Sequence, residues 1–537
     1  MSLLRTLAPG SSRVIRALLL IAWVVQMGIL LKRSVAPGAG VALAADLGRY
    51  GTSARWHGVY YRGEKIGFTV EQTVETPSGY DIEEDGRLQM TLLGAPTAAR
   101  IRTLARVDRT FSLRSFSFSL DPGSGPVKVE GVLDGLMLRL TIETPSSTRT
   151  DARQLSEAPM LSLNLSRRLA ADGLVPGKHR EFLVFDPATL RNAPMSVDIG
   201  RREVVQAAGH PIPAFRVETR FSGVVSTSFV TDVGEVVREE SPTGLFVVRE
   251  TREQAIAAAV PGSLQGDLLE AAAVVPESGP RIDDPVSVER LRLRLDGVEI
   301  PRADLEGAGQ SIAGNVVEIR NLREAPPEGE DTDAGRFLVP EPFIESDAPE
   351  IRAEVEKALR GVEGTRARAE RLVRYVNGLL EKKPTVSLPS ALEVLRTRVG
   401  DCNEHTVLLV AMARADGIPA RMAVGLVYLH GAFYYHAWGE VYLASAHGLG
   451  LWLPVDPTLN QFPADATHLR FARGGLDRQA VILGLLGRLK IAIEDVETRP
   501  GSVPILVGRV GTDPRPPDIP FPRRDPTGPG CWSRPAP

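Results

Sequence analysis

The chain has very little cysteine and no excess of charge of either sign. Its only two cysteines are Cys402 and Cys531, which excludes a small fold held together by several disulfides. A single bridge between them is disfavoured, because Cys531 lies far along the chain in a proline-rich tail. The 63 basic and 66 acidic residues give a net charge of -3. The basic excess typical of nucleic-acid binders is therefore missing, and we expect no nucleic-acid partner.

A glycine-rich phosphate loop is also missing, so we expect no nucleotide and no other cofactor. The N-terminus, in contrast, is distinctive. Residues 17–31 (ALLLIAWVVQMGILL) are apolar except for Gln26, and basic residues flank them on both sides. We predict one membrane helix with a cytoplasmic N-terminus, because more positive charge precedes the run than follows it. The alternative is a removable signal peptide, since Ala42-Leu43-Ala44 resembles a cleavage site.

Either interpretation exports everything after about residue 45. We therefore expect a single-pass protein of the inner (cytoplasmic) membrane, with most of the chain outside the cytoplasm. The length of 537 residues predicts two to four domains. The hydrophobic content of 43% and the charged content of 24% are those of an ordinary globular protein.

Residues 55–248 alternate between apolar and polar side chains, with turn signals at Arg62-Gly63, Asp134-Gly135 and Val233-Gly234. This pattern predicts an antiparallel sheet region, either one curved sheet or a sandwich. We find no catalytic constellation in it and expect a binding or scaffold role. Further on, VSVERLRLRLDGV and NVVEIRN suggest a second, small β unit.

From residue 347 the apolar period becomes helical, over residues 347–361 and again over residues 365–383. Ser390 and Glu393 fit a capping box that opens a further short helix. The predicted class is thus α+β, with a membrane helix, antiparallel β-rich domains and a final mixed domain. The predicted divisions are an N-terminal stub and anchor (1–45), a β-rich domain (46–255), a linker with the small β unit (256–346), the mixed domain with an extension (347–510), and a disordered proline-rich tail (511–537).

Residues 396–421 (RTRVGDCNEHTVLLVAMARADGIPAR) contain the first cysteine. Residues 407–413 are apolar on all sides, which predicts a helix buried over most of its surface, and Gly417 suits a left-handed cap at its end. Cys402 then falls in the first turn, where unpaired amide groups and the positive end of the helix dipole gather. Both effects favour a thiolate, so we expect a lowered pKa for the Cys402 thiol. On this segment alone, a structural cysteine remains the alternative.

The segments that follow predict three strands. Residues 421–429 and 431–443 form a pair that turns at His430-Gly431, with His436 in the second strand. The segment GLWLPVDPT contains a third strand that ends at Asp456, which Pro457 follows. Adjacent strands can bring Asp456 beside His436, and the packed helix can bring Cys402 to the other side of the ring. Such a group would hold a nucleophile, a base and an orienting carboxylate.

The linked motifs GDCNEHTVLLVAMARADGIPAR, YYHAWGEVYL and WLPVDPTLNQ resemble the transglutaminase-like superfamily. The resemblance covers roughly residues 347–473. It implies a papain-like fold, in which helices pack on an antiparallel sheet that carries the histidine and the aspartate. It also implies that Cys402 is the nucleophile, His436 the general base and acid, and Asp456 the residue that orients His436. The segment DATHLRFA is similar to bacterial members, but we assign no chemistry to His468.

By this resemblance the protein is an exported thiol enzyme that acts on peptide or carboxamide bonds through a cysteine thioester. We favour hydrolysis of a peptide or protein in the cell envelope. One alternative is a true transglutaminase, which joins glutamine to lysine or to another amine. A second alternative is an inactive fold retained as an envelope-binding scaffold. The presence of all three residue types in order argues against that last alternative.

A metal site near the cysteine is the remaining possibility. His405 lies three residues after Cys402 on nearly the same helix face, so the two could form a metal-binding pair. No second pair with metal-ligand spacing accompanies it, and we expect no metal. We interpret Asp401 and Glu404 as solvated or capping groups.

Overall fold

The computed structural model describes residues 47–92, 95–123, 125–221, 224–241, 244–257, 273–298, 302–323, 331, 333–384, 388–444, 450–475, 478, 485 and 488–499. The predicted membrane segment at 17–31 and the predicted disordered tail at 511–537 lie outside the described residues. Within the described residues, no helix has both the length and the apolar character that a membrane span needs. Residues 1–54 form a unit separate from residues 55–537, and the description below concerns the second unit.

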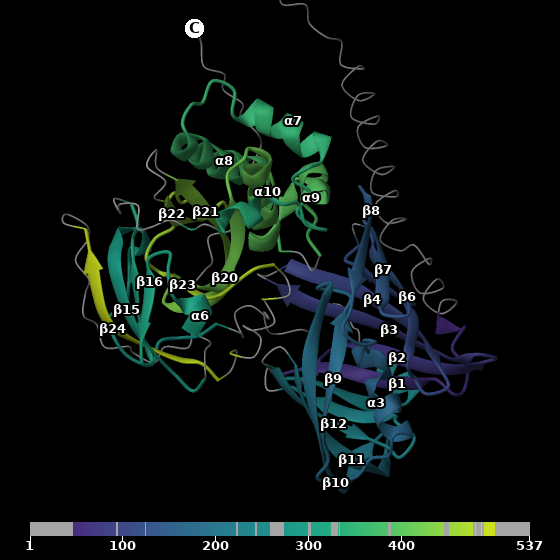
Figure 1. The fold of residues 1–537 in the computed structure, drawn as a ribbon. Helices are drawn as coiled ribbons and strands as arrows, with labels where there is room; N and C mark the ends of the chain where they lie inside the picture. Colours follow the sequence, from purple (N-terminus) through teal and green to yellow (C-terminus); the bar gives the residue numbers. More distant parts are fainter. Residues whose placement is uncertain are drawn as a thin grey trace, which may run out of the picture. The chain divides into compact units, whose positions relative to one another are not determined.

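Fourteen antiparallel strands form the longest sheet (Figure 1). Strands β1 to β8 pair each with the next, strands β9 to β14 do the same, and β1 pairs with β14, so two meanders share one sheet. Of the two predicted alternatives, the structure has the single sheet. Its strands are β1 (Arg55–Tyr61), β2 (Glu64–Thr76), β3 (Gly79–Leu92), β4 (Ala95–Asp108), β5 (Leu113–Asp121), β6 (Val127–Asp134), β7 (Met137–Glu143), β8 (Thr148–Gln154), β9 (His179–Asp186), β10 (Arg191–Ala207), β11 (His210–Phe221), β12 (Val224–Val230), β13 (Val236–Glu240) and β14 (Leu245–Glu250).

The three predicted turns are confirmed. Arg62 and Gly63 have φ values of 49° and 88° between β1 and β2, and Gly135 has a φ of 62° between β6 and β7. Gly234, with a φ of 79°, turns the chain between β12 and β13. Such left-handed backbone suits glycine and matches the twist of tight hairpins.

Helix α3 (Ser162–Ala171) connects β8 to β9, the two outermost strands of the sheet. Leu165 and Leu169 lie one turn apart on the helix, and both are buried in a cluster with Met195, Val217 and Val230. Burial of each leucine contributes roughly 2 kcal/mol. The apolar side of α3 therefore holds the helix against the sheet.

The predicted small β unit is present as a four-stranded sheet in the order β16-β17-β15-β24. Its strands are β15 (Val288–Asp296), β16 (Gln310–Ala313), β17 (Val316–Arg320) and β24 (Lys490–Thr498), and η1 (Pro285–Ser287) and α6 (Arg302–Leu305) accompany them. Strand β24 pairs with β15 from Asp296↔Lys490 to Val288↔Thr498. The sequence placed residues 490–498 in the extension of the last domain and did not predict this pairing. The predicted domain boundaries stay predictions.

Among its described residues, the mixed region contains four helices and a second four-stranded antiparallel sheet, in the order β22-β21-β20-β23 (Figure 1). All residues of α10 from Glu404 to Arg414 are buried, as its apolar sequence predicts, and the helix packs against α7, α8, α9 and β21. The elements are α7 (Pro349–Ala358), α8 (Thr365–Leu379), α9 (Ala391–Thr397), α10 (Cys402–Ala415), β20 (Ala420–Leu429), β21 (Ala432–Ala444), β22 (Gly450–Val455) and β23 (His468–Arg473), with the short pieces η2 (Ala334–Leu338), β18 (Glu381–Lys382) and β19 (Val399–Gly400). A further short helix, α4 (Arg252–Ile256), follows β14 and contacts β1 and β2 of the long sheet.

Candidate active site

The start of α10 is fixed by a reciprocal cap. The Asp401 carboxylate accepts from the amide of Asn403 at 2.9 Å, and the Glu404 carboxylate accepts from the amide of Asp401 at 2.9 Å. This capping box makes Cys402 the first residue of the helix, as predicted, and it gives Asp401 and Glu404 capping roles. A Cβ at Gly400 would lie 2.2 Å from the Cβ of Glu404. Only glycine therefore fits before the cap.

Hydrogen bonds hold this first turn against the middle of β21. The Thr406 hydroxyl donates to the carbonyl of Ala437 at 3.1 Å, and the Tyr435 hydroxyl donates to the Asn403 side chain at 3.3 Å. The main chain of Ala437 also makes a hydrogen bond to the Cys402 thiol. Cys402 is thus hydrogen-bonded to the main chain of the residue after His436. It is a free thiol and keeps partial solvent exposure.

His436 and Asp456 meet as predicted. The two atoms His436 Nε2 and Asp456 Oδ2 are 2.7 Å apart, and both side chains are buried. The other carboxylate oxygen of Asp456 accepts from the amides of Thr458 at 2.7 Å and Leu459 at 2.9 Å. Asp456 directly follows β22, whose last pair with β21 is Gly439↔Val455. Strand pairing therefore delivers the carboxylate to the histidine.

A second imidazole, that of His468, also contacts Asp456; the sequence alone assigns it no role. His468 Nε2 lies 3.1 Å from the same Oδ2 atom of Asp456. Its Nδ1 lies 3.2 Å from Oδ1 of Asp465 and 3.1 Å from the Asp465 carbonyl oxygen. His468 opens β23, which pairs with β20 at Val427↔His468. The signal in the sequence was the short Asp-Ala-Thr-His spacing, which lets a histidine reach back to an aspartate three residues earlier.

Two pKa shifts follow from these contacts. Burial disfavours the charge on Asp456, but the charge of His436 and the hydrogen bonds from both histidines outweigh it and hold the pKa of Asp456 below its usual value. Burial also disfavours a charge on His468, yet Asp465 and Asp456 raise the pKa of His468 to about 10. Asp456 is therefore a carboxylate, and His468 is an imidazolium, at neutral pH.

The expected lowering of the Cys402 pKa is wrong. Burial is the main cause that raises the pKa of the Cys402 thiol well above its usual value. The carboxylates of Asp401, Glu404 and Asp456 act in the same direction, while the hydrogen bond from Ala437 opposes them. The helix start does supply amide groups, but its cap also brings two negative charges next to the sulfur. The resting thiol therefore keeps its proton.

The group has the ligand types of a metal site but not the spacing. Ligand atoms of His436, Asp456 and His468 all lie within 4.8 Å of one another. Two ligands about 2.0 Å from a tetrahedral zinc stand roughly 3.3 Å apart, whereas His436 Nε2 and Asp456 Oδ2 are only 2.7 Å apart. We assign protons to this cluster rather than a metal. In the part of the chain that the structure describes, no metal-binding group of three includes Cys402.

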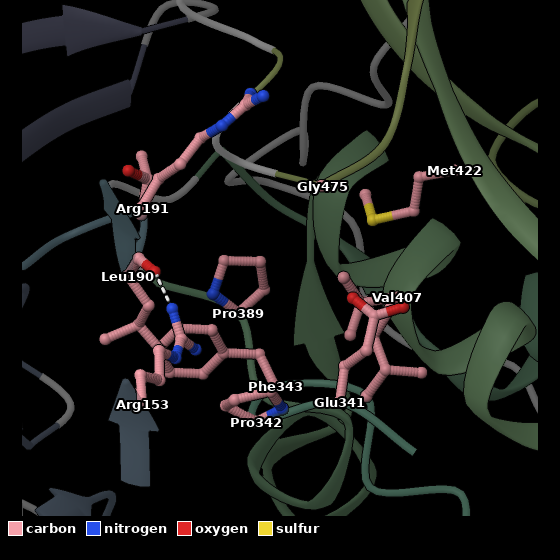
Figure 2. Close-up of a pocket in the computed structure, with 12 residues that line it drawn as sticks. Arg153, Leu190, Arg191, Glu341, Pro342, Phe343, Pro389, Val407, Met422 and Gly475 are labelled. Atoms are coloured by element: carbon pink, nitrogen blue, oxygen red, sulfur yellow. Dashed lines mark hydrogen bonds between the residues drawn. The ribbon is translucent and has the colours of Figure 1, made fainter. Parts of the chain in front are cut away.

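Cavities near this region are separate from the triad. One, of about 240 Å³, is lined by Phe343, Pro389, Val407 and Met422 together with residues of the long sheet, and Figure 2 shows Arg153 bonded there to the Leu190 carbonyl. None of the triad residues lines it. Another, of about 430 Å³, extends to Glu404, two residues from Cys402, and is lined by loops of the long sheet and by α9 and β19.

Residues 353–457 match the transglutaminase-like superfamily, and no curated protein matches the sequence. The chain is also similar to a candidate cysteine protease from Cytophaga hutchinsonii (17% identity, 39% of this chain and 87% of that one, TM-score 0.25). A second similar structure is the β-barrel-like protein of a domain of unknown function from Brucella abortus (12% identity, 37% and 95%, TM-score 0.29). A third is the periplasmic domain of TgpA from Pseudomonas aeruginosa bound to ethylmercury (18% identity, 33% and 92%, TM-score 0.21).

Proposed function

Because residues 353–457 belong to the transglutaminase-like superfamily, we propose that the protein is a thiol enzyme that cleaves peptide or carboxamide bonds through a thioester on Cys402. The observation that carries the proposal is the buried hydrogen bond between His436 and Asp456, beside the first turn of α10. It provides an oriented imidazole on the strand that contacts the first turn of α10, which supports a role for His436 as the base in acyl transfer by Cys402.

The contacts of Asp456 decide which nitrogen of His436 acts as the base. The ionised carboxylate only accepts, so His436 donates from Nε2 and leaves Nδ1 free to accept a proton. Because the resting Cys402 thiol is protonated, its proton moves to Nδ1 as the sulfur attacks the carbonyl carbon. His436 then returns that proton to the leaving amine, and the thioester remains on Cys402. Water, deprotonated by the same Nδ1, releases the acid and restores the thiol.

The start of α10 also offers an oxyanion donor. The first amide groups of a helix have no partner within it, and Cys402 is the first residue of α10. Its N–H can therefore donate to the oxygen that becomes negative during attack.

We further propose that the enzyme acts outside the cytoplasm, anchored in the inner membrane by residues 17–31. The charge pattern around that apolar run supports this orientation. The substrate is then a peptide or protein of the cell envelope, and hydrolysis is the favoured outcome. Cross-linking shares every step up to the thioester and differs only in whether an amine replaces water.

The test uses the full chain with Cys531→Ser, so that Cys402 is the only thiol. We expect this protein to release fragments from fluorescently labelled casein and not to incorporate a fluorescent primary amine into it. Cys402→Ala and His436→Gln should each abolish fragment release while the protein stays folded by circular dichroism. Iodoacetamide should alkylate Cys402 at a rate that still increases above pH 9, because burial raises the thiol pKa.

Other results would contradict the proposal in different ways. Incorporation of the amine in a Cys402-dependent reaction would identify a transglutaminase instead. A folded protein that neither cleaves casein nor incorporates the amine would favour the scaffold interpretation. An alkylation rate that levels off near pH 6 would show that a thiolate is already present at rest, against the direction of the Cys402 shift.

A further inference from the structure

His468 lies between two buried carboxylates and is itself buried. Asp456 is on its Nε2 side at 3.1 Å, and Asp465 is on its Nδ1 side at 3.2 Å. Trp438 packs edge-on against the ring with centroids 5.1 Å apart, and the His436 ring lies 5.8 Å away. The ionisable groups that face His468 are thus Asp456, Asp465 and His436.

The hydrogen bonds require a proton on both nitrogens of this ring. Oδ1 of Asp465 already accepts from the amide of Thr467 at 2.9 Å and from its hydroxyl at 2.6 Å, and Oδ2 accepts from Gln461 at 2.7 Å. The carbonyl of Asp465, the other neighbour of Nδ1, cannot donate. Asp456 accepts at both of its oxygens as well. Each nitrogen of His468 therefore faces an acceptor, and only the imidazolium satisfies both.

We propose that His468 is a positioning residue of the active site: it fixes the Asp456 carboxylate and, through its own positive charge, limits how firmly that carboxylate holds a proton on His436. This inference rests on the proposed function, because it assumes that His436 is the base that must be neutral between turnovers. The raised pKa of His468, about 10, agrees with a charge that persists at neutral pH.

The shared oxygen explains why the second charge matters. His436 and His468 both donate to Oδ2 of Asp456, so the carboxylate divides its attraction between the two rings. A cation whose ring centre is 5.8 Å from that of His436 opposes protonation of His436 by about two pH units at an effective dielectric constant near 20. Loss of the His468 charge would favour the protonated form of His436, and an imidazolium cannot accept the Cys402 proton.

Nuclear magnetic resonance of the full chain labelled with ¹³Cε1-histidine tests this directly. With only 8 histidines in the sequence, single variants suffice to assign the signals of His436 and His468. We expect the His468 signal to keep its imidazolium shift through pH 8.5. In His468→Gln, which keeps a polar side chain without the charge, the titration midpoint of His436 should rise by about two units.

Two results would overturn the proposal. One is a His468 signal that shows a neutral ring at pH 8. The other is an unchanged His436 midpoint in a folded His468→Gln protein, since a purely structural role would leave that midpoint in place. If His468→Gln does not fold, Asp465→Asn replaces it, because this variant keeps the volume and removes one of the two charges. The His468 midpoint must then fall by at least one unit, and an unchanged midpoint rejects the proposal.

The histidine titrations need no substrate, so their outcome is independent of the casein assay. If the protein does not cleave casein but its histidines show the expected shifts, the charge arrangement is supported and the proposed function is rejected. If the protein cleaves casein but His468 is neutral, the proposed function is supported and the positioning role of His468 is rejected.

Discussion

Glu440, in the sheet that carries His436, and Glu84, in the fourteen-stranded sheet, are carboxylates in different surroundings. Glu440 of β21 is fully buried and contacts three arginines, with Arg470 at 2.6 Å, Arg421 at 2.7 Å and Arg473 at 3.3 Å. Burial opposes its charge, yet the arginines lower the pKa of Glu440 to about 2. Asp456 is compensated by two histidines in a similar way.

In the fourteen-stranded sheet, Glu84 of β3 lines a cavity of about 260 Å³ next to α3. Burial, together with the neighbouring carboxylates of Glu71, Glu239 and Asp85, raises the pKa of Glu84 to about 7. Burial likewise raises the pKa of Glu239 in the same cavity.

The difference shows where the fold needs fixed charges. Around β21, each carboxylate is held by cations on neighbouring strands, so its position and its charge are both defined. In the long sheet, Glu84 gains or loses its charge close to neutral pH. The first arrangement suits an enzyme site, where one ionisation state must persist.

The largest expected effect comes from removing the negative charge of Asp456. Asp456→Asn keeps the shape but removes the negative charge, and its NH2 group cannot replace the Oδ1 atom that accepts from the amides of Thr458 and Leu459. We expect casein cleavage to fall by roughly 10³ to 10⁴-fold, because His436 loses its orientation and its counter-charge. Glu84→Gln is the matched control in the long sheet and should leave the rate unchanged. A loss of less than tenfold in Asp456→Asn would remove Asp456 from the triad.

The sequence was a good guide to this site where local patterns determine the structure. The apolar run after Cys402 predicted a buried helix, the glycine turn at residue 431 predicted the β20–β21 hairpin, and period-two strands placed Asp456 next to His436. Each of these features depends on neighbours in the sequence or on adjacent strands. The same holds for the turns of the long sheet.

The sequence was a poor guide where distant segments determine the result. The pKa of Cys402 depends on burial and on carboxylates gathered around the thiol, and the helix dipole considered alone gave the wrong direction. The role of His468 depends on β23 pairing with β20, which brings it to an aspartate that a different strand delivers. The pairing of β24 with β15 joins residues about two hundred positions apart, and no local signal specifies it.

A second prediction concerns the contribution of Glu440 and its arginines to the stability of the fold. Glu440→Gln leaves three guanidinium groups near a neutral amide, in a place where Arg470 is 2% exposed. We expect a loss of about 3 to 5 kcal/mol in the free energy of unfolding, measured by urea denaturation. Glu83→Gln is the control, because its pair with Arg102 is largely solvent-exposed and should cost less than about 1 kcal/mol. Equal losses in the two variants would mean that the buried network adds nothing beyond a surface pair.

The smallest expected effect concerns Glu84 in the fourteen-stranded sheet. The pKa of Glu84 is raised in the folded state, from an ordinary value of 4.5 to about 7. Stability from its neutral form is therefore complete below about pH 4.5 and is lost as the pH rises towards 7, by up to about 3 kcal/mol. Glu84→Gln stays neutral and should reduce this loss. Hydrogen exchange of peptides from β2 and β3, measured at pH 5 and pH 8 and corrected for intrinsic rates, reports the difference. If both proteins lose protection equally between the two pH values, Glu84 is already charged at pH 5. Glu84 would then keep its charge near neutral pH, as Glu440 does.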